Sequence, residues 1–230
     1  MNASDILYED NHLLILNKRV GEIVQGDKTG DVPLPEIVKE YIKVRDNKPG
    51  NVFCGVIHRL DRPVSGAVVF AKTSKALSRM NELVKGRDFH KTYWAIVKFS
   101  DRRPAPEGHL EDWLLRNEKQ NKSYVVKANT SGAKLASLDY RLLSVSEGGY
   151  GLVEVDLHTG RHHQIRCQLS HAGMVIKGDL KYGSPRSNKD AGISLHARKI
   201  TFEHPVKHEQ ITVEAPPPEE FYKMFSDCIE

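Results

Sequence analysis

The segment GVIHRLDRPVSGAVVFAK, from Gly55 to Lys72, places a cluster of charged residues between two apolar stretches. Apolar runs of this length, bounded by turn residues, predict buried strands, so the charged centre falls at the turn between them. A carboxylate in such a place is costly unless it is paired. Asp61, which lies between Arg59 and Arg62, is therefore the first candidate for chemistry. The alternative is a turn aspartate that caps its own backbone before the Arg62–Pro63 bond.

The rest of the chain predicts more strands than helices, and the two do not alternate regularly. Strands are predicted at residues 12–18, 51–57, 66–72, 91–99, 123–127, 136–145, 151–159 and 193–205. Helices are predicted at 36–44, from Thr73 or Ser74 to Gly86, within 160–173, and after the prolines of 215–218. This order favours an α+β domain with a mixed or antiparallel sheet. No stretch has the composition of a linker, so residues 1–230 are expected to form one domain.

Composition limits the classes of protein to which the chain can belong. Its 39% hydrophobic and 28% charged residues are typical of a soluble globular protein. No stretch approaches the roughly 20 apolar residues that span a bilayer, and the N-terminus lacks the basic start of a secretory signal. The three cysteines, Cys54, Cys167 and Cys228, form no CxxC pair. We therefore expect a cytoplasmic protein without a membrane partner.

Positive charge is concentrated in two windows of the chain. Residues 72–91 contain six Lys and Arg residues against two acids, and residues 157–189 contain six against Asp179 alone. The net charge of the whole chain is only +4, so the remaining residues are acidic overall. Segregated charge of this kind suits a polyanionic partner. Two solvated helix faces would produce the same pattern.

Arg166 is a candidate partner for Asp61. On a helix, Arg166 shares a face with His162, His163 and Ser170. A guanidinium can hold a buried carboxylate through two hydrogen bonds and keep it ionised. A solvent-facing arginine is the alternative.

Tyr93 and Trp94 are neighbours in the predicted strand 91–99. Neighbouring side chains point to opposite faces of a sheet. One of the two can therefore face a cleft while the other packs in the core. Packing for both is the alternative.

Four histidines and one cysteine suggest other chemistry. The histidines are His158, His162, His163 and His171. The first two are four residues apart, which suits two metal ligands on one helical face, but Thr159 and Gly160 predict a break between them. No carboxylate or cysteine completes the set, so no metal site is predicted. Cys167 suggests a Cys–His nucleophile, but its place beside the apolar helical face favours an inert, partly buried thiol.

Several motifs together resemble one enzyme family. HRLDRPVSG, KTYWAIV, HTGRHHQIRCQLSHAGMVIKGDLKYG and LHARKITFEHP occur in the order and spacing of the RluA family of pseudouridine synthases. The segment LNKRVGEIVQGD is similar to the N-terminal motif of that family. The resemblance implies a long mixed, largely antiparallel sheet with helices outside and the active cleft across its middle. It also implies a catalytic domain without the N-terminal S4 domain of many relatives.

The resemblance assigns roles to individual residues. Asp61 is similar to the catalytic aspartate of the family, and Arg59 to the arginine that enters the RNA helix when the target uridine flips out. Tyr93 resembles the aromatic residue that stacks on the flipped uracil. Arg166 resembles the ion-pair partner of the aspartate, and Ile165 an apolar wall of the pocket. Further candidates for contact with RNA are Arg62, Lys72, Arg161 and His163.

The implied function is isomerisation of uridine to pseudouridine in ribosomal or transfer RNA, by a monomer that requires neither a cofactor nor a metal ion. One alternative is a catalytically silent RNA-binding module of the same fold. Another is a nucleic-acid hydrolase or N-glycosidase with Asp61 as its base. The hydrolase would release uracil or cut the strand, whereas isomerisation leaves the mass of the RNA unchanged.

Overall fold

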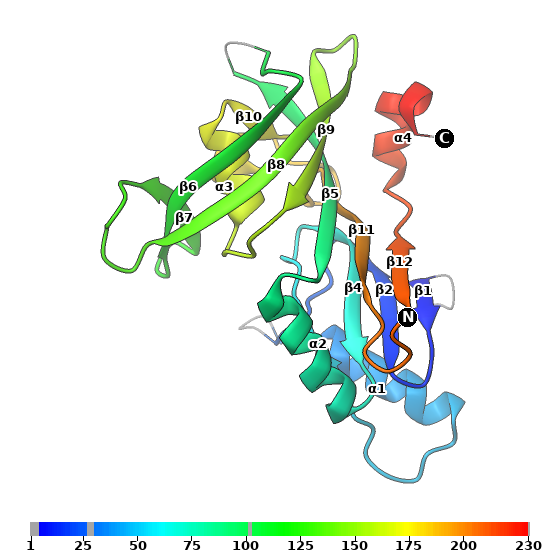
Figure 1. Ribbon diagram of the computed structural model, residues 1–230. Coiled ribbons are helices and arrows are strands. Elements are labelled where there is room, and N and C mark those ends of the chain that lie inside the picture. The colour runs from blue at the N-terminus through cyan, green and yellow to red at the C-terminus, as the bar shows by residue number, and fades with distance from the viewer. Residues whose placement is uncertain (1–4, 27–29, 101–102, 230) are drawn as a thin grey trace. The chain divides into compact units, whose positions relative to one another are not determined.

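Two units make up the computed structural model, which describes residues 5–26, 30–100 and 103–229 (Figure 1). Unit 1 combines residues 1–89 with 197–216, and unit 2 combines 90–196 with 217–230. The predicted α+β class, with a mixed, largely antiparallel sheet flanked by helices, is confirmed. That residues 1–230 form a single domain stays a prediction.

Unit 1 joins strands that are far apart in the sequence. They are β1 (Ile6–Glu9), β2 (Leu13–Lys18), β3 (Gly55–Val56), β4 (Ser65–Ala71), β11 (Leu195–Glu203, which enters the unit at Ala197) and β12 (Gln210–Glu214). The β2 strand pairs antiparallel with β1 and β4, and β11 pairs antiparallel with β12. The helices of the unit are α1 (Leu34–Arg45) and α2 (Ser74–Gly86).

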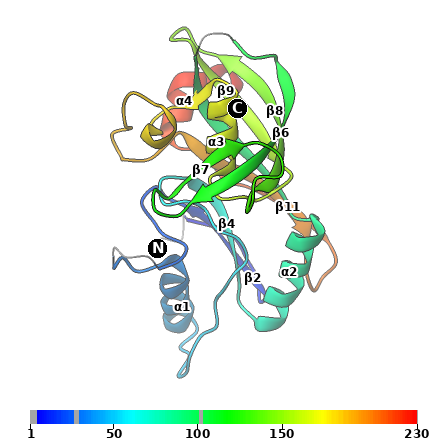
Figure 2. The same cartoon turned by 90° about the vertical axis from the view of Figure 1, so that its left-hand side faces the viewer.

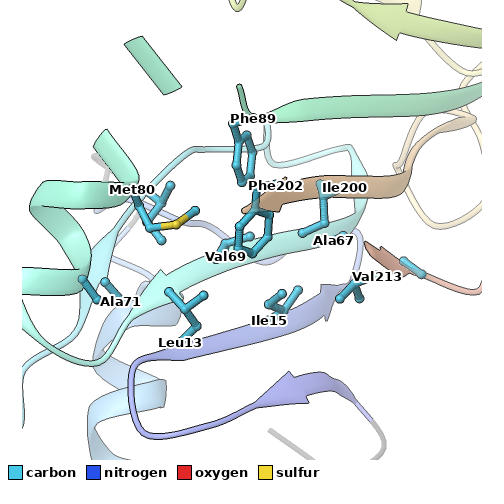
Figure 3. Close-up of a cluster of buried hydrophobic side chains, with 13 residues drawn as sticks. Leu13, Ile15, Ala67, Val69, Ala71, Met80, Phe89, Ile200, Phe202 and Val213 are labelled. Atoms are coloured by element: carbon cyan, nitrogen blue, oxygen red, sulfur yellow. The ribbon is translucent and has the colours of Figure 1, made fainter. Parts of the chain in front are cut away.

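The central strands of unit 1 are buried on both faces. Figure 2 shows α1 and α2 on opposite sides of β2 and β4. Leu13 and Ile15 face α2, and the alternating Leu14 and Leu16 point to the other face, where they are also buried. Figure 3 shows the core on the α2 side, which includes Ala67, Val69, Ala71, Met80, Phe89, Ile200, Phe202 and Val213. Burial on both faces explains why β2 and β4 are continuous apolar runs.

Helix α2 begins and ends where the sequence predicts. The Thr73 side chain accepts a hydrogen bond from the backbone N–H of Ala76 at 3.1 Å, which caps the first turn. The last helical residue is Gly86, and Arg87 follows in the left-handed conformation with φ 69°. Ala76 and Met80 lie on the face that packs in the core.

Unit 2 is built on one antiparallel sheet, in which several neighbouring strands are not consecutive in the chain. Its strands are β5 (His90–Phe99), β6 (Glu107–Asn117), β7 (Lys122–Val126), β8 (Lys134–Val145), β9 (Tyr150–Leu157) and β10 (Met174–Ile176). Their spatial order is β10-β5-β9-β8-β6-β7, and these neighbours pair antiparallel. Its helical segments are α3 (Gln164–His171), η2 (Leu180–Tyr182), α4 (Glu219–Phe225) and η3 (Ser226–Cys228).

The helices α3 and α4 pack on different strands of this sheet. Cys167 of α3 belongs to a cluster with Leu114, Ala136 and Tyr182. Phe221 and Phe225 of α4 cluster with Trp94, Ile96 and Leu152 from β5 and β9. None of the helices in the described parts of the chain has the length and apolar character needed to span a membrane.

Four strands were not predicted, namely β1, β6, β10 and β12. The longest of them, β6, has the sequence EGHLEDWLLRN, in which apolar residues do not alternate with polar ones along the whole strand. The predicted strand 51–57 is reduced to the two residues of β3. Tertiary pairing, rather than local pattern, therefore decides these segments.

Gly66 is required by the close approach of two strands in unit 1. Its φ is +117°, and a Cβ at this position would lie 2.4 Å from the backbone oxygen of Ala197 and 2.5 Å from the backbone nitrogen. No side-chain movement can relieve such a clash. The glycine therefore sets the spacing between β4 and β11 directly after the charged turn.

We expect Gly66→Ala to lower the free energy of unfolding by about 2 kcal/mol or more, because the substitution combines backbone strain with a backbone clash. Urea denaturation followed by circular dichroism measures the change. Gly50→Ala is the matched control, since a Cβ there meets nothing within 4 Å. Equal stabilities for the two variants would contradict the close approach.

Candidate active site

The HRLDR segment of unit 1 leads from β3 into a tight turn before β4. The backbone N–H of Val64 donates to the carbonyl oxygen of Asp61 at 3.0 Å and closes the turn. Ile57 and Leu60 are buried, whereas Asp61 is half-buried and Arg59 is exposed. The apolar residues thus anchor the segment and leave its charged residues close to the surface.

A buried lysine stabilises this turn through hydrogen bonds to its backbone. The side chain of Lys18, the last residue of β2, is only 1% exposed. Its ammonium donates to three backbone oxygens, those of Arg19 at 2.9 Å, Arg62 at 3.2 Å and Val64 at 2.6 Å. The N–H of Gly21 also donates to the oxygen of Arg62 at 2.9 Å. The loop after β2 and the turn before β4 are therefore fastened together at one cation.

The charge of Lys18 also reaches the candidate catalytic carboxylate. Burial lowers the pKa of Lys18 to about 8, and the carboxylates of Glu22 and Asp61 oppose this shift because they favour the ammonium. Below that pH the turn carries a buried positive charge that attracts the carboxylate of Asp61. An ionised aspartate is the form that can serve as nucleophile or base.

Arg59 borders a hollow in unit 1. The hollow has a volume of about 340 Å³ and is lined by Gln25, Val56, Ile57, His58 and Arg59. The guanidinium of Arg59 donates to the side-chain oxygen of Gln25. The neighbouring His58 is fixed, since its Nε2 accepts from the N–H of Val69 at 3.3 Å and its ring packs against Phe89.

The other two basic candidates of unit 1 form ion pairs. Arg62 contacts Asp31 at 2.7 Å and keeps a partly exposed side chain. The ammonium of Lys72 contacts Glu9 and the carbonyl oxygen of Asp10, each at 2.6 Å, and its side chain is 11% exposed. Their contact with RNA stays a prediction.

In unit 2, Arg166 is buried in a salt bridge with Asp179, a pairing that was not predicted from the sequence. Its Nε donates to Asp179 Oδ2 at 2.7 Å and its Nη2 to Asp179 Oδ1 at 2.9 Å. The side chains are 6% and 1% exposed, respectively. The two parallel hydrogen bonds fix the plane of the guanidinium. The ion pair of Arg166 with Asp61 stays a prediction.

A hydrogen-bond chain supports the remaining side of Arg166. Nη1 of Arg166 lies 3.1 Å from His163 Nε2, and His163 Nδ1 lies 3.0 Å from the hydroxyl of Tyr182. That hydroxyl accepts from the N–H of Ser123 at 2.8 Å and donates to its carbonyl oxygen at 3.2 Å. Burial, with the nearby Arg166 cation, lowers the pKa of His163 to about 2. His163 is therefore neutral, accepts from Arg166 and donates to Tyr182.

The other candidates of unit 2 lie on α3 and β5 or beside them. Ile165 on α3 and Tyr93 on β5 are buried, at 5% and 6% exposed. Trp94 packs against α4, so Tyr93 points to the opposite face of the sheet. Arg161 is exposed, and its Nε donates to the carbonyl oxygen of Leu135 at 3.0 Å. The roles of these residues stay predictions.

The geometry offers little support for the alternative chemistries of this segment. The rings of His162 and His163 stack at 3.8 Å, and each has both nitrogens near protein groups. Within the described residues, the four histidines of the segment do not together form a metal-ligating group. Burial raises the pKa of the Cys167 thiol to about 11, so its thiolate is scarce at neutral pH.

Three residues that hold candidate residues in place were not predicted to do so, namely Lys18 in unit 1 and Asp179 and Tyr182 in unit 2. A signal was present for two of them. Lys18 ends the apolar run LLILNK, where a solvated lysine is unexpected, and Asp179 is the single acid in a window with six cations. Tyr182 has no signal apart from its place in the segment KGDLKYG.

Comparisons with known proteins agree with the motifs. A family model described as RNA pseudouridylate synthase matches residues 12–171. The ribosomal large subunit pseudouridine synthase D of Zymomonas mobilis is 29% identical over 231 residues, which cover 96% of this chain and 71% of the relative. The tRNA pseudouridine synthase C of Haemophilus influenzae is 30% identical over 224 residues, which cover 92% of each chain.

One solved structure shows the same fold. The human protein RNA pseudouridylate synthase domain containing 4 matches with a TM-score of 0.81 at 24% identity. The match covers 97% of this chain and 92% of the human chain. It supports the architecture described above.

The buried ammonium of Lys18 predicts a specific dependence of stability on pH. In the unfolded chain Lys18 keeps its proton up to a pKa near 10.5, whereas in the folded chain it loses it near 8. Between these values the unfolded state binds more protons, so Lys18 makes stability rise with pH. We expect the free energy of unfolding of the unmodified protein, relative to Lys18→Met, to increase by at most about 1.4 kcal/mol per pH unit in this range.

Urea denaturation at pH 8, 9 and 10 measures this difference. Lys43→Met, at an exposed lysine of the same unit, is the control and should leave the slope unchanged. A relative stability that falls with pH would contradict the assignment.

Proposed function

The chain belongs to the RNA pseudouridylate synthase family, of the RluA type that its motifs indicate, and from this premise we propose that it converts uridines of structured ribosomal or transfer RNA to pseudouridine with Asp61 as the catalytic residue. Relatives named for each of these two RNA classes support the choice of substrate. The observation that carries the assignment of Asp61 is its position on a turn fixed by the buried ammonium of Lys18.

The reaction places clear demands on the residues of the site. The bond between uracil N1 and ribose C1′ breaks, the uracil turns, C5 bonds to C1′, the proton on C5 is lost, and N1 takes up a proton. Oxidation states do not change and no bond is hydrolysed, so the chemistry requires neither a redox cofactor nor a metal ion. The carboxylate of Asp61 acts either as a nucleophile or as a base at the sugar, and both roles require its ionised form.

The buried ammonium of Lys18 interacts electrostatically with the side chain of Asp61. Arg166, held by Asp179, is proposed as a second cationic partner of the carboxylate. The buried Ile57 and Leu60 beside the turn help to keep water away from the freed sugar carbon. Ile165 is proposed as an apolar wall of the same pocket.

Access to the uridine requires that the base leave its helix. An exposed arginine such as Arg59 is long enough to fill the vacated space, and Tyr93 is proposed to stack on the flipped uracil. Further contacts with phosphates are proposed for Arg62, Lys72 and Arg161. For His163, whose two ring nitrogens contact Tyr182 and Arg166, we propose instead that it positions Arg166. We propose that the protein acts as a cytoplasmic monomer.

We expect Asp61→Asn to reduce the rate of pseudouridine formation by at least about 10³-fold, because an amide can act neither as nucleophile nor as base. The assay measures tritium released from RNA labelled at uracil C5. Asp46→Asn, the same change at an exposed aspartate of unit 1, should retain full activity. Substantial release by the Asp61 variant, with the folded state intact by circular dichroism, would exclude Asp61 as the catalytic residue.

Arg59→Ala distinguishes base flipping from chemistry. Unstacking a base costs a few kcal/mol in a duplex and least in a single strand. We therefore expect the loss of kcat/KM in this variant to be large on a stem-loop RNA and much smaller on a short unstructured RNA with the same target sequence.

The comparison uses both substrates with Arg59→Ala, Asp61→Asn and the control Lys43→Ala, which removes an exposed cation. Asp61→Asn should be inactive on both RNAs, and Lys43→Ala should be active on both. An equal defect of Arg59→Ala on the two RNAs would assign Arg59 to chemistry or general affinity instead of to flipping.

A further inference from the structure

A second group of ionisable side chains lies on the sheet of unit 2, separate from the residues proposed for catalysis. His109 is on β6, Asp139 is on β8, and His158 follows the end of β9. In the strand register, His109 is directly opposite Asp139, which is opposite Asp156. His158 is two residues beyond Asp156 and therefore on the same face. Three neighbouring strands thus bring two imidazoles and a carboxylate together.

The contacts between these side chains are short. Oδ1 of Asp139 lies 2.6 Å from His109 Nδ1, and Oδ2 lies 2.7 Å from His158 Nε2. One potential ligand atom from each residue lies within 4.8 Å of the others. All three side chains are about half exposed, at 52%, 52% and 43% for His109, Asp139 and His158. The convergence is therefore fixed by the sheet, while one side stays open to solvent.

The chemical character of the group suits a particular class of ligand. The group offers one carboxyl group and two imidazoles as possible ligands. Two histidines and one carboxylate are a donor set used by zinc and by other first-row transition metals, whereas magnesium and calcium prefer oxygen ligands alone.

We propose that His109, Asp139 and His158 form a surface binding site for a divalent transition-metal ion of the zinc class. His109 Nδ1, His158 Nε2 and one oxygen of Asp139 are the three protein ligands, and water completes the coordination. On binding, the proton of each neutral imidazole resides on the ring nitrogen that faces away from the ion. For His109 this nitrogen is Nε2, which lies 4.0 Å from the carboxylate of Glu111, an electrostatic partner on the outer side.

A bound ion would join β6, β8 and β9 across one face of the sheet. Because the ligands come from three strands, the ion binds the folded state and stabilises it according to its affinity and concentration. The proposed pseudouridine chemistry does not need this ion. We therefore expect the metal ion to raise the stability of the folded protein and to leave the rate of pseudouridine formation unchanged.

Isothermal titration with ZnCl₂ after removal of metals by chelation tests the proposal. We expect one equivalent of Zn²⁺ to bind the unmodified protein and the affinity to fall at least tenfold in His109→Ala, in Asp139→Asn and in His158→Ala. His208→Ala is the matched control, because His208 is also exposed and contacts a carboxylate, that of Glu203, at 2.7 Å, but forms a pair and not a triad. This control should bind Zn²⁺ as tightly as the unmodified protein.

Each of the other outcomes overturns the proposal. They are no binding by the unmodified protein, unchanged affinity in all three variants, and an equal loss in His208→Ala. Thermal unfolding gives a second measurement, since added Zn²⁺ should raise the Tm of the unmodified protein and of His208→Ala but not that of the variant with His109 and His158 both replaced by alanine. The substituted positions are exposed, so unfolding without zinc should be similar in all of these proteins.

Discussion

The turn that carries Asp61 depends on the hydrogen bonds that the buried ammonium of Lys18 donates to the backbone. Lys18 lies at the end of β2 and satisfies three backbone oxygens from two separate loops. An apolar side chain here would remove a hydrogen-bond donor from each of these oxygens, although the N–H of Gly21 would still donate to that of Arg62, and the lost hydrogen bonds would cost free energy. One side chain thus determines the shape of the turn that carries Asp61 and supplies a positive charge beside it. The conformation of the turn and the positive charge beside Asp61 both come from Lys18.

Unit 2 uses a different device to hold its own cationic side chain. Arg166 is fixed on one edge by Asp179 and on another by His163, which in turn is fixed by Tyr182. The neutral state of His163 matters because a second cation beside the buried guanidinium would be repelled. A side chain that is restrained in this way loses little conformational freedom when it meets a further partner. One buried polar network, around Lys18, therefore holds the turn that carries Asp61, and a second one holds Arg166. The family resemblance relates Asp61 and Arg166 to the same reaction.

The sequence predicts the parts of this protein that local rules govern. The apolar runs of β2, β4 and β5 and the cap of α2 at Thr73 follow from residue pattern alone. The strand β6 does not, because its half-buried residues acquire their environment from β7 and β8, which follow it in the chain.

Some of the candidate site residues could be predicted from the sequence, and others could not. Asp61 and Arg166 could be named from charged residues in apolar surroundings and from the family motifs. Asp179 could not be identified as the partner of Arg166, because the two are thirteen residues apart and Asp179 lies outside helix α3. The role of Lys18 in holding the turn could not be predicted either. The oxygens that it binds belong to the backbone, and every residue type has such an oxygen.

The order of segments along the chain affects how the protein is made. Unit 1 begins with residues 1–89 but needs residues 197–216 to complete its core, to which Ile200, Phe202, Val213 and Ala215 belong. At about 5–20 residues per second, a ribosome needs roughly 5 to 20 seconds to synthesise the intervening segment 90–196. During that time β3 pairs with Phe70 and Ala71 at one end of this edge of β4, and β11 has not yet been made to pair with the rest. The nascent chain therefore presents an unfinished sheet edge on the ribosome, and the charged turn at the start of β4 reaches its final surroundings only after residues 197–216 have been made.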